Sequence, residues 1–587
     1  MMCLSTATLY AKKIAFLVLC CFAFYFVQAQ APAVQWQKML GGSGAEMGAS
    51  VQQTADGGYI VTGYTQSNDG DVSVGYGGYD YWVVKLDNFG ILQWERSFGT
   101  AGAEIAYSVQ QTTDGGYILA GYDAAGGTGG PNYWIIKLAA SGSTQWQRSL
   151  GGSGSEIARC IRQTPDGGYI VAGHTNSSNS GDVGANHGNY DYWVVKLDAG
   201  GTVQWQKLLG GAQDELANWV APTVDNGYII AGHSLSSNSG DVTATGHGSN
   251  DYWMVKLDAT GNIQWQRLLG GSGSDQAFSV LQTTDGGYTV AGRSNSTDGD
   301  VSNNHGGFDY WVVKLNGLGI IQWQNSFGGS GVEQAACMAP VSDGGSVIAG
   351  YSNSTNGDVT GNHGGFDYWL IRLNAAGALQ WEKSLGGSVA DEAFGIQQTA
   401  DGGYVVSGFA SSNDGDASGN HGTGTSDTWV VKLASDGVLP VTFGTLSAAI
   451  TDGNLKVAWE TLEEQNCSHY NVEGSLDGVV FKKLGTVASA ATDGNSSIPL
   501  EYDFSTSAGA LSFASLVLLP LLFSFGRRRY LLHVKCMAVI VLLFGAIACN
   551  KQVGVKPDST STLFIRIAQV DKDGKKHYSK TVMAVRK

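Results

Sequence analysis

The sequence predicts an all-β protein whose main domain is a seven-bladed β-propeller, and three observations lead to that prediction. One segment recurs seven times, and its copies share DGGY, then DYW with a short apolar run and a basic residue, then QW, or close variants of these motifs. Bulky β-branched and aromatic residues recur within each copy with a period of two, which indicates strands and not helices. The chain has few charged residues (14%) but many aromatic residues, which argues against disorder.

The length of the repeat favours a propeller over a β-solenoid. The Trp of the QW motif occurs at positions 36, 94, 146, 205, 265, 323 and 381, so successive copies are 58, 52, 59, 60, 58 and 58 residues apart. Solenoid coils have ~20–30 residues, whereas propeller blades have ~40–50 or somewhat more. The spacing therefore predicts one four-stranded blade per copy.

Each copy accounts for the four strands of a blade. In the first copy, SVQQT, the DGG turn and YIVTGYT predict a hairpin, residues 79–86 predict a third strand, and the QW segment predicts a fourth. The array begins with a lone fourth strand at 34–40 and ends with three strands at 395–433. We expect the first strand to complete the last blade and close a ring over residues 34–438, because closure removes exposed sheet edges.

Charge and the N-terminal segment limit the functional classes. The net charge of −16 argues against a nucleic-acid partner, because such proteins present a basic face. Lys12 and Lys13 precede an apolar run at 14–26, and small residues lie before Gln30. This order is typical of a secretory signal peptide, here residues 1–29, so we expect export through the Sec route.

A loop rich in Asp and Asn, between the second and third strands, is a candidate calcium site. Carboxylate and amide oxygens are the hard ligands that Ca²⁺ prefers. The alternative is that these side chains bond to nearby backbone and shape the loop. Calcium is the one cofactor that the motifs suggest. The candidate ligands are Asp71, Asp182, Asp241, Asp300, Asp358 and Asp416.

A histidine follows this loop in five copies and is a candidate binding residue. A ring of imidazoles at one rim could hold a metal or a ligand. The alternative is that each histidine packs within its own loop, and Tyr76 stands at the equivalent position of the first copy. The five candidates are His187, His247, His305, His363 and His421.

An acidic residue in or after the GGSGxE segment recurs in every copy. Glycosidases need two carboxylates in different environments on one cleft, and a sevenfold repeated acid does not single out such a pair. We therefore interpret these acids as structural and expect specific function where the copies differ: in the shortened loop of the second copy, at Trp219 and at Arg293. The repeated acids are Glu46, Glu104, Glu156, Glu215, Asp275, Glu333 and Glu392.

These motifs resemble the DGGY and DYWVVK propeller-type repeats of secreted bacterial and archaeal surface proteins, particularly those of Bacteroidetes-like organisms. The resemblance implies a propeller at the cell surface. Relatives are loosely grouped with quinoprotein-like propellers, and some carry endoglucanase-like labels. The resemblance therefore leaves open a carbohydrate-active hydrolase and a quinone-dependent redox protein beside a binding module.

A second, smaller domain follows the LPVT sequence. Residues 439–507 and 560–587 alternate apolar and polar residues and resemble the fibronectin type III-like β-sandwich that often follows LPVT in secreted proteins. Between them, two apolar runs flank Arg527–Arg529, which predicts a transmembrane helical hairpin over 508–549. The alternative is lipoprotein-like processing at Cys549, which follows Ala-Ile-Ala.

The leading functional hypothesis is an exported, envelope-anchored propeller that binds a protein or a polysaccharide without catalysis. We expect it to be a monomeric ring that faces the periplasm or the exterior and is held in the membrane through 508–549. The alternatives are an endoglucanase-like hydrolase and, third, a quinoprotein-like redox propeller. Ligand identity and binding face do not follow from the motifs.

Overall fold

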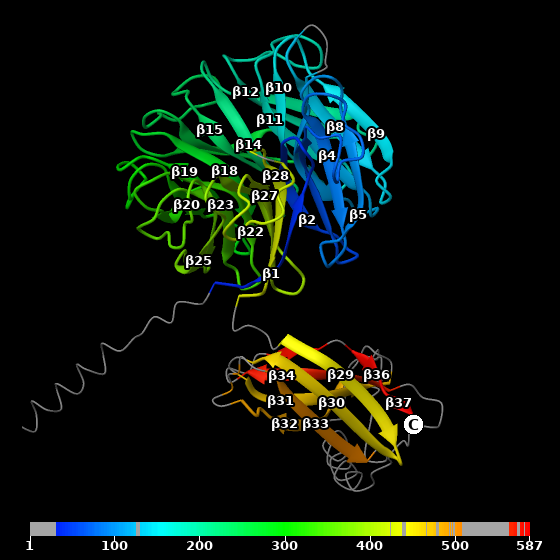
Figure 1. Cartoon of the computed structure of the whole chain (residues 1–587). Coiled ribbons are helices and arrows are strands. Elements are labelled where there is room, and N and C mark those ends of the chain that lie inside the picture. The colour runs from blue at the N-terminus through cyan, green and yellow to red at the C-terminus, as the bar shows by residue number, and fades with distance from the viewer. Residues whose placement is uncertain are drawn as a thin grey trace, which may run out of the picture. The chain divides into compact units, whose positions relative to one another are not determined.

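The computed structural model describes two compact units, the first ending at Asp436 and the second lying within 442–586. The described residues form strands and no α-helix, which confirms the all-β prediction for the described parts of both units (Figure 1). The described residues are 31–124, 129–422, 424–436, 442–464, 467–476, 481–491, 494, 496, 499–507, 563–571, 576–579 and 581–586.

The described part of the first unit consists of four-stranded antiparallel sheets, each made from consecutive strands except the last. The first four sheets are β2 (Glu46–Gln53), β3 (Tyr59–Thr65), β4 (Asp80–Leu86), β5 (Leu92–Phe98); β6 (Ile105–Gln111), β7 (Tyr117–Asp123), β8 (Asn132–Leu138), β9 (Thr144–Leu150); β10 (Glu156–Gln163), β11 (Tyr169–Thr175), β12 (Asp191–Leu197), β13 (Val203–Leu209); and β14 (Glu215–Pro222), β15 (Tyr228–Ser234), β16 (Asp251–Leu257), β17 (Ile263–Leu269). The others are β18 (Asp275–Gln282), β19 (Tyr288–Ser294), β20 (Asp309–Leu315), β21 (Ile321–Phe327); β22 (Glu333–Pro340), β23 (Ser346–Ser352), β24 (Asp367–Leu373), β25 (Leu379–Leu385); and β26 (Asp391–Gln398), β27 (Tyr404–Ala410), β28 (Asp427–Leu433) with β1 (Val34–Leu40).

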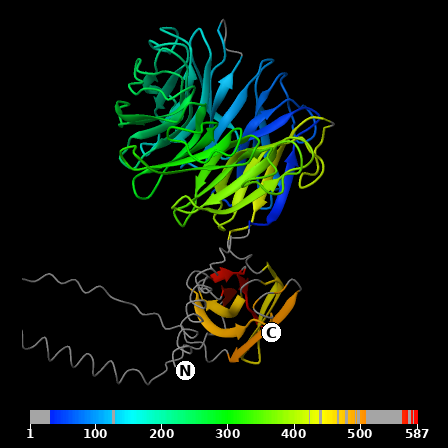
Figure 2. The same cartoon turned by 90° about the vertical axis from the view of Figure 1, so that its left-hand side faces the viewer.

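The first strand of the chain completes the last of these sheets. β1 pairs antiparallel with β28, with Leu40 opposite Thr428, as the offset of the motifs predicts. Successive sheets pack against one another, and β2 of the first sheet contacts β26 and β27 of the last. Figures 1 and 2 show the sheets of this unit side by side in chain order, with a propeller-like arrangement.

The Tyr and Trp of the DYW motif join neighbouring sheets. The hydroxyl of Tyr192 donates to the main-chain oxygen of Trp253 in the next sheet at 3.0 Å, and both side chains are fully buried. At the junction of the last sheet with the first, Thr428 replaces the tyrosine, and its buried hydroxyl has no hydrogen-bond partner in the described part of the chain. The same bond joins Tyr81 to Trp134, Tyr133 to Trp193, Tyr252 to Trp311, Tyr310 to Trp369 and Tyr368 to Trp429.

The Trp of the QW motif packs on a glycine turn of the next sheet. Gly261 has a φ of 82°, and a Cβ atom there would lie 3.0 Å from the ring of Trp205, so glycine alone fits this contact. Because β28 and β1 are not consecutive in the chain, the last sheet has no such turn. There, the indole of Trp381 donates to Asp436 at 3.1 Å, so a residue beyond β28 fills that place.

The second unit packs two sheets around one hydrophobic core. The sheets have the orders β33-β30-β29-β37 and β32-β31-β34-β35, with β36 beside β34. The core includes Trp459 and Tyr502 from one sheet and Tyr470 and Ile567 from the other. β34 pairs with β31, so residues on both sides of segment 508–562 belong to this unit. The strands are β29 (Thr442–Thr451), β30 (Asn454–Glu463), β31 (Cys467–Ser475), β32 (Lys482–Ala488), β33 (Leu500–Ser507), β34 (Phe564–Asp571), β35 (Lys576–Tyr578), β36 (Val582–Met583) and β37 (Val585–Arg586).

Several sequence predictions fall outside the described residues. They are the signal peptide at 1–29, the helical hairpin at 508–549 with its arginines, processing at Cys549, and part of the shortened loop of the second copy. Among the residues that the structure does describe, no helix is long and apolar enough to cross a bilayer.

Candidate functional site

The six predicted calcium ligands join their loops to the turn that precedes each sheet. The main-chain NH of Asp241 donates to the oxygen of Gly210 at 2.7 Å, and its carboxylate accepts the NH of Gly210 at 3.3 Å. These bonds shape the loop, which is the alternative that the sequence left open. Across the described ranges, no three His, Cys, Asp or Glu side chains are grouped as a metal site would need. The same pair of bonds links Asp71 to Gly41, Asp182 to Gly151, Asp300 to Gly270, Asp358 to Gly328 and Asp416 to Gly386.

The five predicted binding histidines each contact a buried carboxylate of their own sheet. Nδ1 of His305 lies 2.8 Å from the carboxylate of Asp309, which also accepts the main-chain NH of His305 at 2.6 Å. The imidazoles remain between 36% and 39% exposed. Two of them also approach an aspartate of the next sheet, with Nε2 of His187 3.8 Å from Asp241 and Nε2 of His363 3.9 Å from Asp416. These contacts join neighbouring copies at most, so the structure does not gather the five into one site. The equivalent pairs are His187 with Asp191, His247 with Asp251, His363 with Asp367 and His421 with Asp427.

The repeated acids are buried and bonded within their turns, with one correction to the sequence assignment. Glu215 accepts the NH of Gly211 at 2.6 Å and the hydroxyl of Ser234 at 2.7 Å. In the last copy the equivalent residue is Asp391, which is fully buried and accepts the NH of Gly387 at 2.8 Å. The assignment of Glu392 to this set was therefore wrong by one position. Because neighbouring residues of a strand point to opposite faces, Glu392 lies on the other face of β26.

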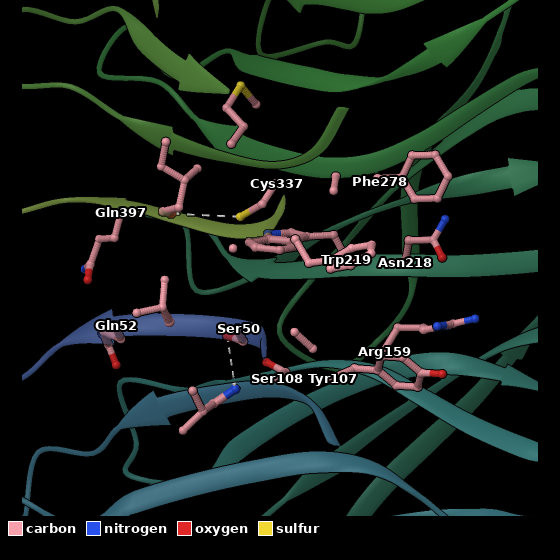
Figure 3. A pocket seen from close by; sticks show the side chains of 18 of the residues that line it. Ser50, Gln52, Tyr107, Ser108, Arg159, Asn218, Trp219, Phe278, Cys337 and Gln397 are labelled. Atoms are coloured by element: carbon pink, nitrogen blue, oxygen red, sulfur yellow. Dashed lines mark hydrogen bonds between the residues drawn. The ribbon is translucent and has the colours of Figure 1, made fainter. Parts of the chain in front are cut away.

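A cavity of about 700 Å³ lies among the first strands of the sheets of the first unit (Figure 3). We call it the central cavity. Its walls come from β2, β6, β10, β14, β18, β22 and β26, with Tyr64 of β3. Cavities of ~300–1,000 Å³ are the usual size for small-molecule sites, so the central cavity is the best candidate site of this unit.

The side chains that line the central cavity differ from copy to copy, although they occupy equivalent strand positions. Variation among the seven first strands at these positions is the signal that could have revealed the site. The sequence prediction singled out only one of the lining residues, Trp219. Three residues after the buried acid, the strands carry Ala49, Tyr107, Arg159, Asn218, Phe278, Ala336 and Phe394. Six residues after it they carry Gln52, Gln110, Arg162, Ala221, Leu281, Ala339 and Gln397, of which all but Ala221 line the cavity.

Trp219 is the largest departure from the repeat. It stands at an irregularity in the pairing of β14 with β15, where the other first strands carry Ser, Cys or Gly. Its half-buried ring packs against the core cluster that contains Cys337 of β22, so it reaches beyond its own sheet. The guanidinium of Arg162 lies 4.5 Å from the ring centroid, which is cation–π geometry.

Among the residues that the structure describes, two arginines and no carboxylate line the central cavity. The guanidinium of Arg159 lies 4.3 Å from the ring centroid of Tyr107, and that of Arg162 donates to the hydroxyl of Ser108 at 3.0 Å. No ion pair within 4 Å to either arginine is found in the described part of the chain. The Nε of Arg159 is buried and has no hydrogen-bond partner within the described ranges. The cavity is therefore a basic region in an acidic chain.

Titratable groups on the second strands lie near these arginines. Burial, with a smaller effect of Arg159, lowers the pKa of His174 to about 3, and burial with Arg293 lowers the pKa of His233 to about 4. Both imidazoles are therefore neutral at pH 7, and the arginines carry the positive charge. Arg293, which the sequence singled out, donates to the amides of Gln276 and Gln334 at 2.8 and 2.7 Å.

Comparisons with known proteins show limited similarity. No family model matches the chain. The regulatory protein FlaEY of Caulobacter vibrioides is 25% identical over 197 residues, which cover 32% of this chain and 20% of that protein, so the chain matches only a fifth of the length of this relative.

Solved structures resemble the chain only weakly. Sqt1 from Chaetomium thermophilum has a TM-score of 0.34 at 13% identity, covering 73% of this chain and 96% of its own. Puromycin hydrolase has a TM-score of 0.36 at 12% identity, covering 74% of this chain and 62% of its own. Trypanosoma rangeli sialidase, in complex with the inhibitor DANA, has a TM-score of 0.31 at 8% identity, covering 72% of this chain and 85% of its own. Likenesses of this size carry no functional argument.

Proposed function

We propose that the first unit is a closed seven-bladed β-propeller that binds a ligand in its central cavity without catalysis. The pairing of β1 with β28 and the contacts of β2 with the last sheet support closure. The repeat resemblance supports a secreted surface protein with a fibronectin type III-like second domain, anchored to the cell envelope through 508–549. The protein is then a rigid module that presents one small site to a polysaccharide or a protein.

The composition of the central cavity carries this proposal. Its lining combines two arginines, aromatic rings and the amides of Asn and Gln, which are groups that hold and orient a ligand. A glycosidase would need two carboxylates ~5–10 Å apart on one cleft. The described lining has none, and the repeated acids are buried in turns outside it. A binding role therefore fits this site better than the endoglucanase-like alternative, and no described feature favours a quinone cofactor.

Ligand screening of the purified full chain on glycan and protein arrays tests the proposal. We expect a ligand whose affinity falls roughly tenfold or more in Trp219→Ala, which corresponds to a loss of about 1.4 kcal/mol. Trp146→Phe is the matched control, because this half-buried ring lies on an outer strand, β9, away from the cavity. Binding that Trp219→Ala leaves unchanged, or reducing ends released from any polysaccharide, would overturn the proposal.

A further inference from the structure

We propose that the central cavity recognises an anionic sugar, with Arg159 holding the oxyanion and aromatic rings holding the sugar ring. This inference rests on the proposed function and names the ligand class of the same site. The shared chemistry is a carboxylate or a sulfate on a pyranose ring.

The positive charge of the cavity favours a ligand with a negative charge. The chain carries a formal net charge of −16, yet the described lining of the cavity contains Arg159 and Arg162 and no acidic side chain. Each guanidinium contacts an aromatic ring, and neither has an ion-pair partner among the described residues. A partly buried charge without a counter-charge is costly, so an anionic group of the ligand would stabilise this arrangement.

The orientation of Arg159 makes it the anchor. Its guanidinium is held over the ring of Tyr107, and its buried Nε has no partner among the residues that the structure describes. A guanidinium presents donors in a planar fork that fits two oxygens of a carboxylate or a sulfate. Arg162 is already bonded to Ser108 and to the main-chain oxygen of Ile161, so it contributes charge while Arg159 supplies free donors.

The rest of the wall around Arg159 suits a sugar ring. Figure 3 shows Tyr107 beside Arg159, with Asn218 and Phe278 on neighbouring strands and Trp219 close by. Half-buried aromatic faces stack on the C–H faces of a pyranose, and amide groups bond its hydroxyls. A volume of about 700 Å³ accommodates a short oligosaccharide and not a folded protein domain. The observations therefore favour an acidic saccharide over a protein surface.

Calorimetry on the full chain tests the inference with three matched probes: trigalacturonate, a sulfated galactotriose and neutral galactotriose. We expect one anionic probe to bind roughly tenfold or more tightly than the neutral one, with affinity that falls as salt rises. Arg159→Gln should remove that preference, and Arg159→Lys should restore part of it because it keeps the charge and loses the fork. Arg148→Gln is the control, since Arg148 lies on β9 over Trp146, away from the cavity.

The outcomes separate this inference from the proposed function. Equal binding of all three probes, or an acidic preference that Arg159→Gln leaves intact in a variant with an unchanged melting temperature, overturns the anionic-sugar assignment alone. The assignment also fails if none of the probes binds while another ligand depends on Trp219. If no ligand depends on Trp219, the proposed function itself fails.

Discussion

The contacts between sheets are nearly the same from copy to copy, whereas the walls of the central cavity differ from copy to copy. Between sheets, the Tyr–Trp hydrogen bond and the bonds of Asp loops to glycine turns recur almost unchanged around the first unit. In the cavity, equivalent positions carry side chains as different as Ala336 and Arg159. A position that holds two sheets together recurs at nearly every junction, whereas a position that faces the cavity is free to vary. Variation among copies therefore marks the functional site.

The largest difference between the two regions should appear when a tryptophan is removed from each. Trp311 is fully buried in the sheet core, so Trp311→Ala should lower the free energy of unfolding by about 3–5 kcal/mol. Trp219 is half-buried against the cavity, so Trp219→Ala should cost clearly less stability while it removes ligand binding. Urea unfolding of both variants measures this, and equal losses would contradict the distinction between scaffold and site.

A smaller effect should follow from the loss of a tyrosine hydroxyl. In Tyr252→Phe the main-chain oxygen of Trp311 loses its bond at 2.9 Å, and stability should fall by about 1 kcal/mol. Tyr107→Phe in the cavity is the matched control and should have no measurable effect on stability, because its ring contact with Arg159 remains. If both variants unfold at the same urea concentration, the hydroxyl bridge does not stabilise the junction.

Glu392 should give the first unit a pH dependence. Burial raises the pKa of its carboxyl from 4.5 to about 7. Between these pH values the folded state keeps a proton that the unfolded state has lost, so this group makes stability fall as pH rises from 4.5 to 7. Glu392→Gln should flatten that part of the curve of melting temperature against pH. The melting temperature at pH 4 should stay unchanged. A curve identical to that of the original chain would show that Glu392 is ionised when folded.

Chelation should have the smallest effect. The six loop aspartates are bonded to the main-chain NH of glycine turns, so their geometry does not depend on Ca²⁺. We expect the melting temperature of the full chain to be the same with EDTA and with added calcium. A rise of several degrees on addition of Ca²⁺ would restore the calcium hypothesis for these loops.

The repeat alone predicted most of the first unit because nearly every strand, turn and interface position recurs from copy to copy. The sequence was less informative where one residue type serves two purposes. An Asp in a Gly-rich loop fits a calcium site and a backbone bond equally well, and His187 and its equivalents fit a ligand ring as well as a contact with their own carboxylate. In the last copy, Asp391 and Glu392 are adjacent acids, and the strand register decides which of them is buried.

By itself, the sequence determined the all-β class and the strands of each copy, since periodicity is a local property of the chain. It also determined the pairing of the first strand with the last sheet, because the order of the motifs leaves one strand over at the start and one missing at the end. The tertiary structure decided where the copies meet. Arg159, Tyr107 and Trp219 lie on three different strands, and only packing of those strands around one cavity brings them together. A site built from the first strands of several copies has no local pattern within one copy, because the contacts that define it exist only after the sheets have packed.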